Sequence, residues 1–214
     1  MRRIYAFPLM LFVSFLSFSQ PQQSTNDILN AVQKKYSSVK NISADFIQKR
    51  TLRFGNSIQE EQGKIIISSD DKYKIETETQ TLVTDGATVW VYSHARNQVL
   101  IGTNTTTEMN FSLNKFLLGL PADYSAALLS AKDSLYVLQL RSLKKKPDPL
   151  MPSAFTVKIR KKDFLISVVE YFDRNKTKTE ITLANILINQ KLPEQYFEFR
   201  IPANTAVVDT RKMK

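Results

Sequence analysis

The stretch Thr81-Leu82-Val83-Thr84-Asp85-Gly86-Ala87-Thr88-Val89-Trp90 contains two runs of strand-forming residues on either side of an Asp-Gly pair. Asp-Gly between apolar runs is a strong signal for a two-residue hairpin turn, because both residues tolerate the positive φ that such a turn needs. The stretch therefore predicts an antiparallel β-hairpin. It also has the period of two that the rest of the chain follows.

Similar segments, rich in β-branched and aromatic residues, recur on both sides of this hairpin. Polar turn sequences separate several of them, among them 69–71, 94–97 and 174–176. A regular series of short strands and turns predicts an antiparallel meander in a protein that is mainly β. The predicted strands begin at about Ile42 and continue with 63–69, 72–78, 80–84, 87–92, 98–101, 134–143, 154–161, 164–172 and 178–189.

Three helices are expected besides the strands. The first begins with a cap at 24–27 and places Ile28, Val32 and Tyr36 on one face, which should pack against the sheet. A second is predicted over 112–118, because Gly119 and Pro121 follow it, and a third over 122–131.

Several predicted strands carry apolar residues on both faces, which a sheet with one solvated face does not. Ile65-Ile66-Ile67 and Ile186-Leu187-Ile188 are examples. Three short helices are too few to cover the second face of so many strands, so a sheet that curls around an apolar interior is the economical arrangement. The residues alone leave open whether side chains fill this interior or an apolar ligand occupies it.

The first nineteen residues have the features of a cleavable signal peptide. Arg2 and Arg3 precede an apolar run from Ile4 to Phe18, and Ser17 and Ser19 are small residues where a signal peptidase would read them. We expect residues 1–19 to be removed during secretion and residues 20–214 to form one domain. The run is too short to span a bilayer comfortably.

Composition removes most catalytic and metal-binding classes from consideration. The 214 residues include no cysteine and a single histidine, so thiol catalysis, disulfides and multi-histidine metal sites are excluded. That histidine, His94, lies in a predicted turn, and no nucleophile motif or phosphate-binding loop is present. We therefore expect no catalytic residues, no metal, no cofactor and no enzymatic activity.

The chain is basic, with a formal net charge of +10. Secretion argues against a nucleic-acid partner. The excess of cations then indicates either a solvated basic surface or attraction to an acidic membrane or protein surface.

Several motifs, taken in order, resemble the periplasmic outer-membrane lipoprotein carriers, the LolA family. They are 43–49 (Ser-Ala-Asp-Phe-Ile-Gln-Lys), 61–65 (Glu-Gln-Gly-Lys-Ile), 82–92 with its Asp-Gly, Trp and Tyr, and 97–99 (Asn-Gln-Val). The ending Phe197-Glu198-Phe199-Arg200-Ile201-Pro202, with Val207-Val208-Asp209, resembles the last strand and closing segment of the family. The resemblance covers most of the mature chain, and the block at 82–92 is its most specific part.

This resemblance implies a single, strongly curved antiparallel sheet, an unclosed half-barrel whose concave apolar face is covered by helices. It also implies a carrier that takes the acyl chains of lipoproteins from an inner-membrane ABC transporter and passes them to an outer-membrane receptor. We expect the carrier to be a monomer. The lipid-binding cavity is expected to be lined by Phe46, Ile65, Ile67, Tyr73, Ile75, Val83, Trp90, Tyr92, Phe116, Leu117, Phe155 and Val157.

One departure from the family pattern keeps a second function open. The carriers have an Arg-Pro pair, implicated in tethering the lid, in the turn where this chain has Ser69-Asp70. The alternative is a periplasmic module of the same fold that binds another lipid or glycolipid in envelope biogenesis or sensing.

Overall fold

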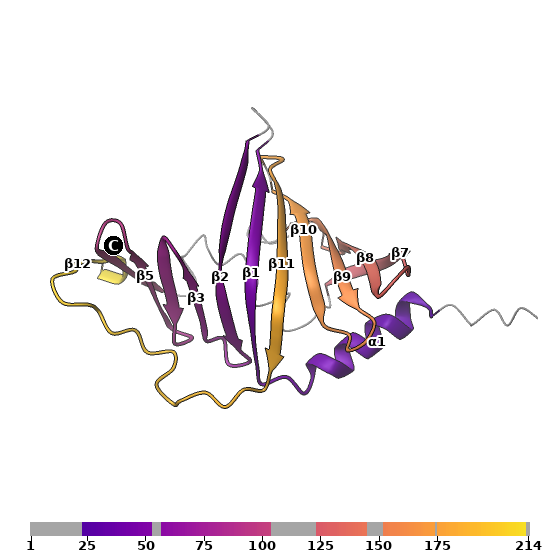
Figure 1. The fold of residues 1–214 in the computed structure, drawn as a ribbon, viewed down its shortest axis with the longest axis horizontal. Helices are drawn as coiled ribbons and strands as arrows, with labels where there is room; N and C mark the ends of the chain where they lie inside the picture. The colour runs from indigo at the N-terminus through magenta and orange to yellow at the C-terminus, as the bar shows by residue number, and fades with distance from the viewer. Residues whose placement is uncertain (1–22, 53–56, 104–122, 145–151, 174, 213–214) are drawn as a thin grey trace, which may run out of the picture.

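The computed structural model describes residues 23–52, 57–103, 123–144, 152–173 and 175–212 (Figure 1). One α-helix, one sheet and a short 3-10 helix at Thr210–Lys212 account for their regular structure. The helix is α1 (Thr25–Tyr36). The strands are β1 (Asn41–Thr51), β2 (Ile58–Ser68), β3 (Tyr73–Thr77), β4 (Gln80–Thr84), β5 (Thr88–Ser93), β6 (Gln98–Thr103), β7 (Tyr124–Ser130), β8 (Leu135–Ser142), β9 (Ala154–Arg160), β10 (Ile166–Phe172), β11 (Lys178–Ile188) and β12 (Ala206–Asp209).

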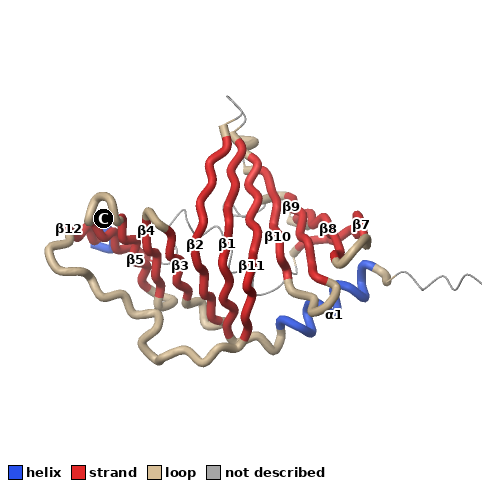
Figure 2. The backbone as a smooth tube through the Cα atoms, viewed as in Figure 1, coloured by secondary structure: helices blue, strands red, loops and turns tan. Residues whose placement is uncertain are grey.

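All twelve strands belong to one sheet, in the order β12-β6-β5-β4-β3-β2-β1-β11-β10-β9-β8-β7. The sheet is not closed and curves into a half-barrel, with β2 and β1 at its centre (Figure 2). The predicted meander is confirmed within β1–β6 and within β7–β11. The two meanders are joined by the long β1–β11 ladder, which pairs Ile42 with Ile188 and Thr51 with Lys178.

The hairpin at Asp85-Gly86 is confirmed, but its turn is longer than the predicted two residues. Thr84 pairs with Val89, so the four residues from Asp85 to Thr88 lie between the last paired positions. Gly86 alone adopts a positive φ, of 98°, while the Asp85 carboxylate accepts hydrogen bonds from the backbone N–H groups of Ala87 and Thr88 at 2.9 and 2.8 Å. The aspartate closes the turn through its side chain, which removes the need for a second residue at positive φ.

The helix predicted over 122–131 is wrong, because β7 occupies this segment. Alanine and leucine give the segment a local helix preference, but Tyr124, Ala126 and Leu128 alternate with more exposed residues and pair with β8. Packing of these three against the core therefore outweighs the local preference. The helix predicted over 112–118 lies outside the described residues, as does the predicted signal peptide.

The last strand also differs from the expected one. Residues 197–201 form no strand, and β12 pairs instead, in parallel, with β6. A parallel neighbour requires a crossing connection, and the segment 189–205 supplies it, running from the end of β11 past β1–β3 to β12 (Figure 1).

Helix α1 forms as predicted. The Ser24 hydroxyl accepts from the Asp27 N–H at 3.2 Å and the Asp27 carboxylate accepts from the Ser24 N–H at 3.1 Å, a reciprocal capping box. Ile28, Val32 and Tyr36 are buried against the sheet. In the described part of the chain, no helix combines the length and hydropathy that a membrane span requires.

Candidate functional site

Alternate residues of the central strands form one apolar face, on which α1 packs; we call it the inner face and the opposite side the outer face. Five of the residues expected in the cavity lie on the inner face in adjacent positions: Phe46 faces Gly63, Ile65 pairs with Ile75, and Ile67 pairs with Tyr73. Ile65 and Ile67 are 1% and 0% exposed, and Ile75 is half-buried.

The other half of the sheet continues this face. Phe155 pairs with Leu140 and Val157 with Leu138, so two more expected residues join the same contiguous cluster. The sequence reasoning missed the partners in β8 as site residues, although their alternation was visible. Other members that it missed are Tyr136, Ile166, Val169, Ile181 and Leu183.

The inner face is closed by packed side chains, and α1 is the described helix that covers part of it. Val157 is 0% exposed, as are Ile28 and Val32 of the helix. Burying each such side chain stabilises the fold by about 1.5–3 kcal/mol. A ligand can therefore reach this face only when part of its cover moves aside.

Two polar contacts hold α1 in place over the apolar cluster. The Tyr36 hydroxyl accepts a hydrogen bond from the backbone N–H of Ile166 at 3.0 Å, and burial raises the pKa of Tyr36 to about 12. Near the start of the helix, the Tyr136 hydroxyl donates to the Gln23 side chain. These bonds give α1 a defined position that apolar packing alone would leave less specific.

Val83, Trp90 and Tyr92 do not belong to this group. Val83 pairs with Trp90 across β4 and β5, and the strand register places both on the outer face together with Tyr92. The C-terminal segment covers them there, with Phe197 buried and Phe199 in contact with the Tyr92 ring at a centroid distance of 6.1 Å. The expectation that these three share one cavity with Phe46 and Ile65 does not agree with this register. Phe116 and Leu117 lie outside the described residues.

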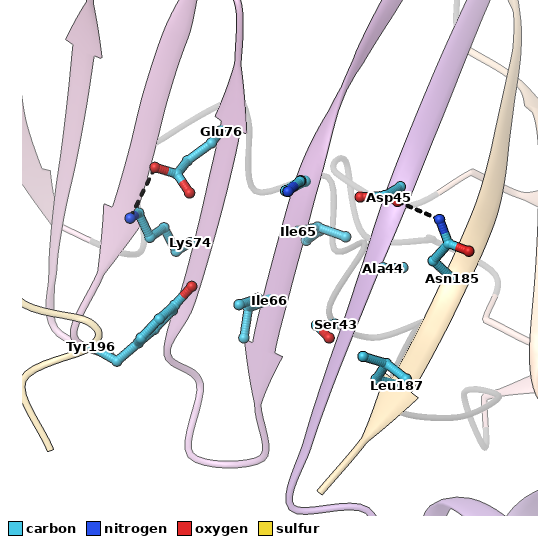
Figure 3. A pocket seen from close by; sticks show the side chains of 11 residues that line it. Ser43, Ala44, Asp45, Ile65, Ile66, Lys74, Glu76, Asn185, Leu187 and Tyr196 are labelled. Atoms are coloured by element: carbon cyan, nitrogen blue, oxygen red, sulfur yellow. Dashed lines mark hydrogen bonds and ion pairs between the residues drawn. The ribbon is translucent and has the colours of Figure 1, made fainter. Parts of the chain in front are cut away.

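The outer face has a groove of its own, with a volume of about 340 Å³ (Figure 3). Its lining is mixed: Asp45 accepts from the Asn185 amide at 2.7 Å and Lys74 pairs with Glu76 at 2.9 Å, while Leu187 adds an apolar side chain. Ile66 lies on its floor and Tyr196 of the C-terminal segment at its edge. This mixture of charged, polar and apolar side chains contrasts with the apolar inner face.

Comparison with known families agrees with this architecture. The family model described as outer membrane lipoprotein carrier protein LolA matches residues 37–200. The chain belongs to the LolA family. The matched range covers β1–β11, and therefore every strand that contributes to the inner face.

Relatives with this name span nearly the whole chain at low identity. An outer-membrane lipoprotein carrier protein of Histophilus somni is 24% identical over 192 residues, covering 86% of this chain and 88% of the relative. One from Psychromonas ingrahamii is 23% identical over 222 residues, covering 99% and 100%. Among solved structures, an uncharacterized conserved protein from Thermus thermophilus has the same fold, with a TM-score of 0.55 at 17% identity, covering 87% of this chain and 99% of that one.

The turn at Ser69-Asp70, where the LolA resemblance implied an arginine, is a surface turn held by an ion pair and a backbone hydrogen bond. The Asp70 carboxylate pairs with the Lys72 ammonium at 2.7 Å, and hydrogen bonds from Lys72 and from Ser68 lower the pKa of Asp70. The Ser69 N–H donates to the Lys40 carbonyl at 2.9 Å. The turn is therefore hydrogen-bonded to the residue that precedes β1, and the Asp70 and Lys72 side chains remain partly exposed to solvent.

His94 lies in the β5–β6 turn, as predicted, and its ring nitrogens contact the Thr81 hydroxyl at 3.0 Å and the Glu78 carbonyl oxygen at 2.8 Å. Among the described residues, no three His, Asp or Glu side chains gather as a metal site would need.

Proposed function

We propose that this LolA family protein is a periplasmic carrier that shields the acyl chains of lipoproteins against its inner face. The observation that carries the proposal is the contiguous apolar cluster, which extends across both halves of the sheet and beneath α1. Membership of a lipoprotein carrier family supplies the cargo class. The carrier accepts acylated lipoproteins from an inner-membrane ABC transporter and delivers them to an outer-membrane receptor, acting as a monomer and without catalysis.

Binding and release of acyl chains require that part of the cover over the inner face can move. Removing acyl chains from water contributes about 0.8 kcal/mol per buried methylene, so full burial of three long chains would exceed the practical ceiling of about 18–21 kcal/mol for non-covalent affinity. Displacing packed side chains such as Ile28 and Val32 of α1 offsets part of this gain. A partly offset affinity lets the carrier release its cargo to the receptor.

The test uses two isoleucines that match in size and burial but lie on opposite faces. Ile75 in β3 is half-buried on the inner face, and Ile66 in β2 is half-buried on the outer face, at the groove of Figure 3. The mature protein, Ile75→Gln and Ile66→Gln are titrated with a fluorescent triacylated lipopeptide. We expect Ile75→Gln to weaken binding by about tenfold, the equivalent of about 1.4 kcal/mol, and Ile66→Gln to bind like the unmodified protein.

Equal effects of the two substitutions, or no binding of the lipopeptide at all, would contradict the proposal. Organic extraction and mass spectrometry of the protein purified from periplasm then distinguish the alternative function. Acyl peptides in the extract support a lipoprotein carrier, whereas a different lipid in stoichiometric amount supports the specialised lipid-binding module. Depletion of a general carrier should also leave lipoproteins in the inner membrane.

A further inference from the structure

Five lysines from three separate segments gather at the end of the sheet where α1 leads into β1. They are Lys34 and Lys35 in the last turn of α1, Lys40 before β1, Lys162 in the β9–β10 turn and Lys191 after β11. We call this group the basic end. Lys35 is half-buried and the other four side chains are exposed.

Hydrogen bonds tie these segments together, so the lysines share one end of the folded molecule. The Tyr36 hydroxyl bonds the Ile166 N–H beside the β9–β10 turn. Asn189, at the end of β11, donates to the Ser38 carbonyl at 3.0 Å and accepts from the Lys40 N–H at 2.7 Å. Figure 1 shows α1, this turn and the end of β11 meeting along the same edge of the molecule.

The charge of the basic end is not neutralised by its surroundings. Among the described residues, no carboxylate forms an ion pair with any of the five lysines. Two nearby acids are already engaged, Asp163 with Arg160 at 2.6 Å and Asp70 with Lys72 at 2.7 Å. Asp71 lies in the β2–β3 turn, whose Ser69 N–H bonds the Lys40 carbonyl, and Glu194 follows Lys191 by three residues. Two acids against five lysines leave a surplus of positive charge.

We infer that the basic end binds the anionic phospholipid surface of a membrane. Lysine ammonium groups are flexible point charges, without the fixed forked geometry by which arginine selects a single carboxylate or phosphate. The groove of Figure 3 lies on the outer face and includes none of the five. An array of exposed lysines without a recess suits a layer of phosphate headgroups better than a shaped protein partner.

This docking goes beyond the proposed function and does not depend on the identity of the cargo. It has a consequence for access, because two of the five lysines belong to the helix that covers the inner face. A molecule bound through its basic end holds α1 against the membrane surface. The cover of the inner face then lies where an acyl chain would enter or leave the bilayer.

The experiment compares two triple variants with the same net charge. The first, Lys34→Gln/Lys162→Gln/Lys191→Gln, neutralises exposed lysines of the basic end. The matched control, Arg96→Gln/Lys176→Gln/Arg200→Gln, neutralises three exposed cations elsewhere: Arg96 and Lys176 lie in turns at the opposite end of the sheet and Arg200 in the C-terminal segment. Mature protein without cargo is floated with vesicles of phosphatidylcholine alone, or of phosphatidylcholine and phosphatidylglycerol, at low and at physiological salt.

We expect binding to vesicles that contain phosphatidylglycerol, weakened by salt, and little binding to phosphatidylcholine alone. Each lysine near an anionic surface contributes about fivefold to partitioning, so the basic-end variant should lose at least about tenfold while the control loses much less. Equal losses would show that only net charge matters and would overturn the inference. Absence of binding by the unmodified protein, or binding only to membranes that carry an acidic protein partner, would overturn it as well.

Discussion

Gly63 allows the central strands to pack closely. It faces Phe46 across the β1–β2 ladder, and a Cβ at this position would overlap the Glu76 carbonyl oxygen of the neighbouring strand and approach the Phe46 ring to 3.0 Å. The absent side chain is what allows the Phe46 ring to lie over the strand. A strand glycine of this kind marks a close approach of backbone and side chain.

We therefore expect Gly63→Ala to lower the free energy of unfolding by about 1–3 kcal/mol, because β3 or the Phe46 ring must shift. Urea unfolding measures this change. Gln62→Ala, at the exposed neighbouring position, is the control and should stay within about 0.5 kcal/mol of the unmodified protein. An unchanged free energy of unfolding for Gly63→Ala would contradict this expectation, because it would show that the sheet accommodates the added methyl group without destabilisation.

Two buried tyrosines make stability fall at high pH. Burial raises the pKa of both Tyr36 and Tyr73 to about 12. The unfolded chain then loses these phenol protons from about pH 10 while the folded chain keeps them, so the free energy of unfolding decreases by about 1.4 kcal/mol per pH unit for each tyrosine. Urea unfolding between about pH 10 and 12 should show this slope in the unmodified protein and a much shallower one in Tyr36→Phe/Tyr73→Phe. An equal slope in both proteins would assign the pH dependence to other groups.

Among the elements, α1 combines a short local cap with a position over the inner face, so its stability should govern access to that face. Hydrogen bonds from the Ser24 hydroxyl and then from its backbone N–H lower the pKa of Asp27. The contribution of this cap is therefore complete above the ordinary aspartate pKa and is lost as pH falls through the lowered value. The cap also holds the helix against fraying from its first turn.

Removing the cap should increase access to the inner face without altering the side chains that form this face. Ser24→Ala is expected to destabilise α1 by about 1 kcal/mol, to speed hydrogen exchange of the α1 amides and to speed association of a fluorescent acyl probe. Asn26→Ala, in the first turn but outside the capping box, should leave exchange and association as they are. Faster exchange without faster association would mean that α1 is not the part of the cover that moves.

The strands show which elements a local pattern can predict. Alternation of apolar residues located β2–β6 and β8–β11 to within a few residues, because each strand must bury one side on the core. The pattern failed at β7. Alanine and leucine favour a helix locally there, and the segment forms a strand because it pairs with β8. The pattern also gave no indication of the β1–β11 ladder, whose partners are far apart in the chain.

For the whole molecule, the sequence predicted a curved apolar sheet but not which side of it each aromatic residue faces. Leu82, Val83 and Thr84 are all buried, because the apolar cluster lies on one side of β4 and the C-terminal segment on the other. Burial on both sides removes the alternation that would mark the inner face. Trp90 and Tyr92 were therefore grouped with Phe46 and Ile65, from which the sheet itself separates them.

This separation gives a prediction that uses the single tryptophan of the chain. If acyl chains lie on the inner face, a lipopeptide with brominated acyl chains, which quenches on contact, should bind and leave Trp90 fluorescence largely unchanged. In the matched variant Trp90→Phe/Tyr73→Trp the reporter lies on the inner face instead, and the same lipopeptide should quench it strongly. Strong quenching of Trp90 with weak quenching at position 73 would place the lipid on the outer face, between the sheet and the C-terminal segment.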